Sequence, residues 1–260
     1  MRSLLNSPPL VTLVLALALS ALLPAHAQVR YSVPLDGTAA KLWSTKDTKL
    51  VCSLIHDIPK YGYAEFKTVA GRELRSSLEI VPRLGINDRS EMRFIAAKPE
   101  WQSGGNETLL GRIEIFNGFN PFAGATLTWK ILSALNNGKQ VLMPYTDGKL
   151  APGENIVPTL SPLGFDKPYE AYLVCQHNLL RVGFNDVRML PLAFKFQQKT
   201  LTAPSEARIR QQLDYVKADP SIAQITIRAF AYDMRTRTDN MRMADERAAE
   251  LQKMFIGHAH

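Results

Sequence analysis

A carboxylate and a guanidinium near the C-terminal end of the chain have the spacing of a small binding pocket. The strand-like run Ile225–Tyr232 ends in Asp233, and a helix-like run with Asn240 and Arg247 at fixed offsets follows. The end of a strand and the first turns of the next helix can meet in space, so Asp233 and Arg247 are expected to lie together. Such a pair can bind the ammonium and the carboxylate of a small zwitterion.

The same residues also have purely structural interpretations. Arg247 borders the apolar stripe of its predicted helix, so it could form a structural ion pair with Asp233 or extend its head group into water. Asn240 most simply caps the helix that follows it. Spacing alone leaves these alternatives open. The stripe consists of Met243, Ala244, Ala248, Leu251 and Phe255.

The elements that position this pair follow a βαβα order after Val187. Leu190–Phe196 is a predicted strand, and Ser205 is expected to cap a helix that runs through Lys217. The second strand is Ile225–Asp233, and the second helix begins at Asn240 and extends to about Phe255. We therefore predict a C-terminal domain over residues 185–260.

The preceding part of the chain, residues 28–184, consists of short period-two runs broken by turns. Tyr61–Lys67 and Gly111–Phe116 both alternate in this way, which favours a mostly β domain shaped as a barrel or a sandwich. Two helices are expected within it, over Ala125–Leu135 and Tyr169–Leu180. The predicted fold class is therefore α+β in two domains.

The first 27 residues have the pattern of a cleavable secretory signal. Arg2 precedes the apolar run Leu10–Leu19, and an Ala-x-Ala ending at Ala27 follows. We expect a mature chain that begins at Gln28, has no transmembrane segment and works in the periplasm. The formal net charge is +7. In an exported protein this charge indicates an anionic wall, lipid or acidic protein partner, and no nucleic acid.

Cys52 and Cys175 are the two cysteines of the chain. In an oxidising compartment a single pair predicts one disulfide, while two buried free thiols remain an alternative. Neither cysteine has a second Cys or a suitably spaced His beside it, so no metal site is expected, and we interpret His56 as a core residue.

Catalytic signatures are missing from the sequence. It contains no Ser/His/Asp or Cys/His set in a supporting motif, and no glycine-rich phosphate loop. We therefore predict a protein that is not an enzyme and uses no cofactor.

The C-terminal motif resembles the signature of OmpA-like peptidoglycan-binding domains. Asp233, Asn240 and the Arg247–Ala248 pair match it, with Met243 at the position of the family's leucine. The resemblance implies that Asp233 and Arg247 bind the diaminopimelate of peptidoglycan and that Asn240 lies near the ligand. The family's domain continues beyond its second helix, so we expect a partial domain that lacks its last strands.

The N-terminal part resembles the MotY family of flagellar motor proteins. The resemblance is carried by Trp43, Cys52–Pro59, Tyr61–Phe66 and Trp129–Ser133, and by the Cys175 region. It implies a component of the periplasmic T-ring that docks on the flagellar basal body with a MotX-like partner. Its C-terminal domain would hold peptidoglycan and help to fix the stator units. A general OmpA-like wall-binding protein of the envelope, without a motor role, is the alternative.

Overall fold

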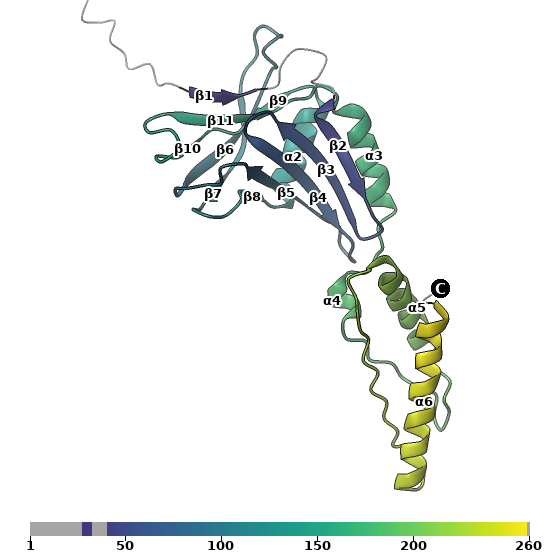
Figure 1. Cartoon of the computed structure of the whole chain (residues 1–260). Coiled ribbons are helices and arrows are strands. Elements are labelled where there is room, and N and C mark those ends of the chain that lie inside the picture. Colours follow the sequence, from purple (N-terminus) through teal and green to yellow (C-terminus); the bar gives the residue numbers. More distant parts are fainter. Residues whose placement is uncertain (1–27, 33–40, 259–260) are drawn as a thin grey trace, which may run out of the picture.

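The protein has a mixed α+β fold with two β-sheets, shown by a computed structural model that describes residues 28–32 and 41–258 (Figure 1). The predicted signal peptide lies outside these residues. One sheet has the order β1-β11-β9-β6-β7, with β10 paired to β11. Its strands are β1 (Gln28–Tyr31), β6 (Ser90–Ala97), β7 (Thr108–Ile115), β9 (Gln140–Leu142), β10 (Tyr145–Thr146) and β11 (Asn155–Leu160).

The second sheet has the order β2-β3-β4-β5-β8, and all its neighbouring strands are antiparallel. Both sheets are open in the part of the chain that the structure describes, so the barrel form of the expected β domain is wrong. Its strands are β2 (Trp43–Asp47), β3 (Val51–Ile58), β4 (Gly62–Val69), β5 (Arg75–Pro82) and β8 (Phe122–Ala123).

Strict alternation sets the register of the second sheet. In β4, Ala64, Phe66 and Thr68 are fully buried, whereas the side chains between them face outward. A slip by one residue would turn this buried set towards water, so the burial pattern fixes the pairing. The buried face joins residues of the first sheet, such as Met92 and Phe94, in one hydrophobic core.

Two helices complete the β-rich part, close to where the sequence predicts them. Helix α2 (Ala125–Asn136) buries Ile131 and Leu135 against β5 and β9. Helix α3 (Asp166–His177) begins three residues before the predicted start and packs on β2 and β3. Cys175 lies on α3, as expected.

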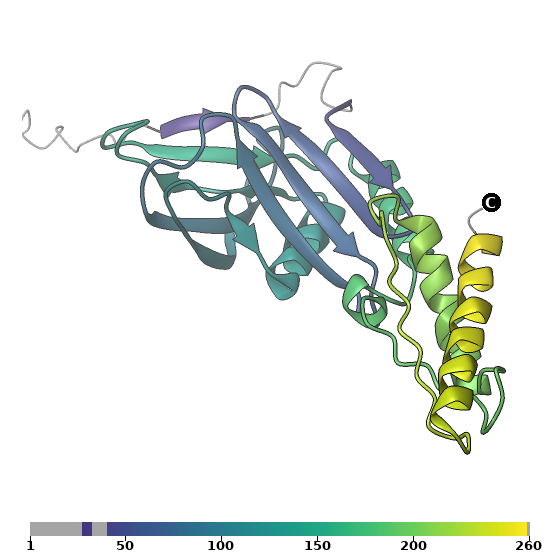
Figure 2. The same cartoon turned by 60° about the horizontal axis from the view of Figure 1, so that its bottom comes forward.

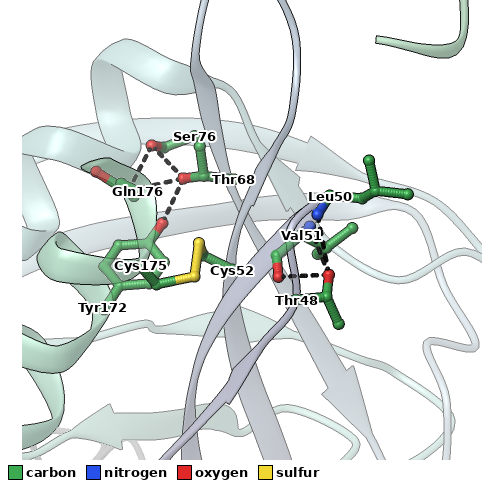
Figure 3. The surroundings of a disulfide bond; sticks show 9 residues. All are labelled: Thr48, Leu50, Val51, Cys52, Thr68, Ser76, Tyr172, Cys175 and Gln176. Atoms are coloured by element: carbon green, nitrogen blue, oxygen red, sulfur yellow. Dashed lines mark hydrogen bonds between the residues drawn. A yellow bond between two sulfur atoms is a disulfide. The ribbon is translucent and has the colours of Figure 1, made fainter. Parts of the chain in front are cut away.

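The disulfide between Cys52 and Cys175 joins β3 to α3 (Figure 3). A buried polar network lies beside it and joins α3 to the neighbouring strand β4. The Thr68 hydroxyl lies 2.7 Å from the Tyr172 hydroxyl, and the Gln176 amide donates to Thr68 Oγ1 at 2.8 Å. Covalent and polar contacts therefore fix α3 on the sheet together.

His56 lies at the centre of the core and is fully buried. Its ring contacts that of Trp43, with centroids 4.4 Å apart, and its Nε2 accepts a long 3.5 Å bond from the Ser161 amide. Burial lowers the pKa of His56 from 6.5 to about 3. This position agrees with the prediction that His56 is a core residue.

We predict that His56 makes the protein less stable in mild acid. The folded pKa is lower than the unfolded one, so the unfolded state binds more protons between pH 3 and 6.5. The free energy of unfolding should therefore fall by about 1.4 kcal/mol for each pH unit in this window as the pH decreases. Urea unfolding at several pH values, compared with His56→Gln, measures the contribution. Equal pH slopes for both proteins would contradict it.

The remaining residues contain α4 (Phe184–Val187), α5 (Ala203–Ala218) and α6 (Arg237–His258). The expected βαβα order is wrong, because neither predicted strand forms within the described residues. Leu190–Phe196 makes one isolated bridge, between Phe194 and Leu201, and Ile225–Asp233 makes no ladder. Figure 2 shows α5 and α6 side by side, with an extended segment running along them.

The extended segments are held by helix side chains in place of a ladder. Helix α5 begins at Ala203, so Ser205 lies inside it and does not cap it. The Ser205 hydroxyl accepts instead from the Ala193 amide at 2.8 Å. A small core is covered by Leu192, Phe194 and Ile227 of these segments. Alternate residues point inward, which gives the segments the period-two pattern of a strand. The buried residues of that core are Leu201, Ile209, Leu213 and Leu251.

Helix α6 begins three residues earlier than predicted. The Thr236 hydroxyl accepts from the Asp239 amide at 3.1 Å, so Thr236 serves as the cap that we had assigned to Asn240. No helix in the described part of the chain is long and apolar enough to cross a membrane. The domain boundary near residue 185 stays a prediction.

Candidate binding site around Asp233 and Arg247

The structure brings the predicted carboxylate and guanidinium together. Asp233 lies in the bend before α6, and Arg247 projects from the middle of that helix. Arg247 Nη2 lies 3.0 Å from Asp233 Oδ2, and Nη1 lies 3.4 Å from Oδ1. The pair is therefore bidentate, the geometry that a guanidinium and a carboxylate favour. Its two side chains are 6% and 16% exposed, so the carboxylate is the more accessible partner.

The remaining donors of Arg247 bind backbone carbonyls from both extended segments. Its Nε donates to Gln198 O at 3.0 Å, and its Nη2 reaches Lys195 O at 3.4 Å. Its Nη1 donates to Phe230 O at 3.3 Å. The guanidinium also lies over the Phe194 ring, 4.9 Å from its centroid. Arg247 therefore ties segments from both sides of α5 to α6.

Asp233 is fixed by the turn at Gln197 as well as by Arg247. The Gln197 amide donates to Asp233 Oδ2, and the Gln197 side chain donates to the Asp233 carbonyl at 3.1 Å. The Gln197 amide bond, followed by Arg247, lowers the pKa of Asp233 against the opposing effect of desolvation. The carboxylate therefore stays charged at neutral pH and can accept from a ligand ammonium.

Asn240 shapes the bend that carries Asp233. Its Oδ1 accepts from the Met234 amide at 3.1 Å, and its Nδ2 donates to Thr236 O at 2.9 Å. Asn240 belongs to the first turn of α6 and supports the bend from the helix side. All three predicted site residues thus meet around residues 233–240.

The backbone turn at 195–198 is the part of the site that sequence reasoning missed. It supplies two carbonyls to Arg247 and one amide to Asp233. Gln197 has a φ of 52°, a left-handed value that is uncommon outside glycine. We had predicted a strand up to Phe196, and no Gly or Asn marks this turn in the sequence. The sequence therefore carries no residue signal for this turn.

Beside the ion pair, two aromatic side chains face water. Phe230 and Tyr232 are 65% and 86% exposed, and their rings are nearly parallel with centroids 6.5 Å apart. They alternate with Ala231, which is buried. The segment before Asp233 therefore presents two aromatic rings to water on the side opposite Ala231.

Comparison with known proteins identifies the family. The MotY N-terminal domain matches residues 34–181, more than half of the chain. The sodium-type flagellar protein MotY of Vibrio parahaemolyticus is 26% identical over 209 residues, which are 80% of this chain and 71% of that protein. These similarities define the class as flagellar motor-associated proteins. The chain belongs to the MotY N-terminal domain family.

Proposed function

We propose that this protein is a periplasmic structural component of the polar flagellar motor. In this proposal residues 28–184 dock on the basal body, with a MotX-like partner, as part of the T-ring. Residues 185–260 anchor stator units to peptidoglycan. The match of residues 34–181 to the MotY N-terminal domain is the observation that carries the proposal. A general wall-binding envelope protein would give no reason for that match.

The proposed wall contact is the diaminopimelate of the peptidoglycan peptide, held in the manner of an OmpA-like domain. The Asp233 carboxylate would accept from its ammonium, and Arg247 would hold its carboxylate. The Arg247 bonds to Lys195 O and Phe230 O are longer than its 3.0 Å bond to Gln198 O. These weaker contacts are the ones that a ligand carboxylate can replace. Support comes from the meeting of Asp233, Arg247 and Asn240 at one bend.

A periplasmic location is supported by two independent features. The first 27 residues have the pattern of a secretory signal. The disulfide between Cys52 and Cys175 also suits an oxidising compartment, where such bonds persist.

A deletion strain tests the motor role. Cells without the protein should assemble filaments but swim slowly or not at all, because the stators would lack their anchor while filament export would be intact. Swimming speed and electron microscopy of filaments provide the two readouts, with a plasmid copy of the wild-type gene as the control. Normal swimming, or a loss of filaments, would contradict the proposal.

A further inference from the structure

A groove on the β-rich part lies between α2 and the edge strand β7, away from Asp233 and Arg247. Its volume is about 730 Å³. Ala96 and Ala134 line it together with Thr108 and Leu110 of β7 and the exposed side of α2. Thr108 and Leu110 are two residues apart on β7, and Thr108 is paired with Ala96 of β6, so one face of these two strands forms the floor of the groove.

The α2 side of the groove carries residues that the fold does not need. Within Trp129–Ser133, Ile131 and Leu132 are fully buried and make core contacts. Trp129, Lys130 and Ser133 face outward and line the groove, and Trp129 is 40% exposed. An exposed tryptophan on a helix beside an open groove is typical of the central residues of protein interfaces.

The charge of the groove is of one sign. Its charged lining residues are Lys130 and Lys139, and neither forms an ion pair with any described residue. Glu107, next to the lining residue Thr108, is the acidic residue nearest in sequence at the β7 end. Two free ammonium groups beside an indole favour a partner with carboxylates and an apolar side chain.

We propose that this groove binds an acidic segment of the basal-body protein on which the chain docks, with an apolar side chain of that segment packed on Trp129. The inference rests on the proposed docking role of residues 28–184 and names its contact surface. In this arrangement Lys130 and Lys139 pair with the carboxylates of the segment. A surface of this kind gives affinity from the indole and orientation from the charges.

The test uses the full-length chain in the deletion strain. Basal bodies are purified from cells that produce the wild type, Trp129→Ala, or Lys130→Glu with Lys139→Glu, and the protein retained per basal body is quantified by immunoblot. Matched controls are Tyr63→Ala, which is 37% exposed, and the double substitution of the exposed Lys41 and Lys46 by Glu. Both control sites belong to the other sheet or its approach. Circular dichroism and the intact disulfide show that each variant is folded.

We expect retention to fall about tenfold or more for both groove variants and to stay unchanged for both controls. If the wild type itself is absent from basal bodies, the proposed docking function and this inference both fail. If the wild type is retained and the groove variants are retained equally, only this inference is overturned. The inference would also be overturned if the groove variants remained bound to basal bodies but no longer bound peptidoglycan sacculi. That result would assign the groove to a glycan.

Discussion

Replacing Arg247 with alanine is expected to weaken binding to peptidoglycan sacculi by about tenfold or more. The substitution removes the group that would hold the diaminopimelate carboxylate, a charge-assisted bond worth about 1.5–3 kcal/mol. It also removes the guanidinium donor from three backbone carbonyls and leaves Asp233 with the Gln197 amide as its backbone donor. Arg247→Lys should restore binding only in part, because an ammonium cannot form the bidentate contact. Co-sedimentation with purified sacculi measures both variants.

Stability must be separated from binding in this experiment. Breaking a buried pair typically costs 3–5 kcal/mol, so Arg247→Ala could also loosen the two segments that Arg247 holds. Arg242→Ala is the matched control, because Arg242 lies on the same helix with a side chain that is 67% exposed. Unfolding curves show whether the variant is folded under the assay conditions. A folded Arg247→Ala protein that sediments like the wild type would refute the site, and so would a wild type that does not bind.

Removal of the disulfide is expected to destabilise the β-rich part strongly. The bond joins residues 123 positions apart. In the chain-entropy account a loop of this length restricts the unfolded chain by roughly 5 kcal/mol. Cys52→Ser with Cys175→Ser should therefore lower the urea midpoint clearly, as followed by tryptophan fluorescence, and the wild type in reductant should show the same shift.

Two further measurements sharpen this result. Alkylation without reductant, followed by intact-mass analysis, should leave the wild type unmodified, and two added groups would refute the bond. Thr68→Val, which removes the hydroxyl shared by Tyr172 and Gln176, is the non-covalent counterpart. We expect the free energy of unfolding to fall by a smaller amount, about 1–3 kcal/mol, because the buried polar groups of Tyr172 and Gln176 would lose the hydroxyl that they share. An unchanged midpoint in the serine variant would show that this network alone fixes α3.

Elements with strong periodicity could be predicted, and those that depend on neighbours could not. The alternation of β4 and the apolar stripe of α2 are local signals, and both elements form where they were expected. Ile225–Asp233 has the same local character, but a strand also needs a partner for its backbone, and no strand of the described residues is paired with it. Pairing is a property of the whole fold, so propensity misassigned this segment.

The candidate site shows the same division. We predicted that Asp233 before α6 and Arg247 on that helix would lie together, although spacing alone also allowed Arg247 to extend into water. Their contacts to Lys195, Gln197 and Gln198 depend on a backbone turn with no glycine to mark it. The start of α6 was misplaced for a different reason: the Thr236-x-x-Asp239 pattern is a cap signal that we passed over in favour of Asn240.

The position of Cys175 has a mechanical consequence. The chain leaves α3 only a few residues beyond this cysteine, and Leu180 is then bonded to Lys49 and Gly71 as the chain turns towards α4. Tension applied through residues 185–260 would first strain these hydrogen bonds. It would then reach the sulfur–sulfur bond, which passes the load into β3, a strand paired on both sides by β2 and β4. Helix α3 therefore cannot be peeled from the sheet beyond Cys175 by a pull from the C-terminal side while that bond is intact.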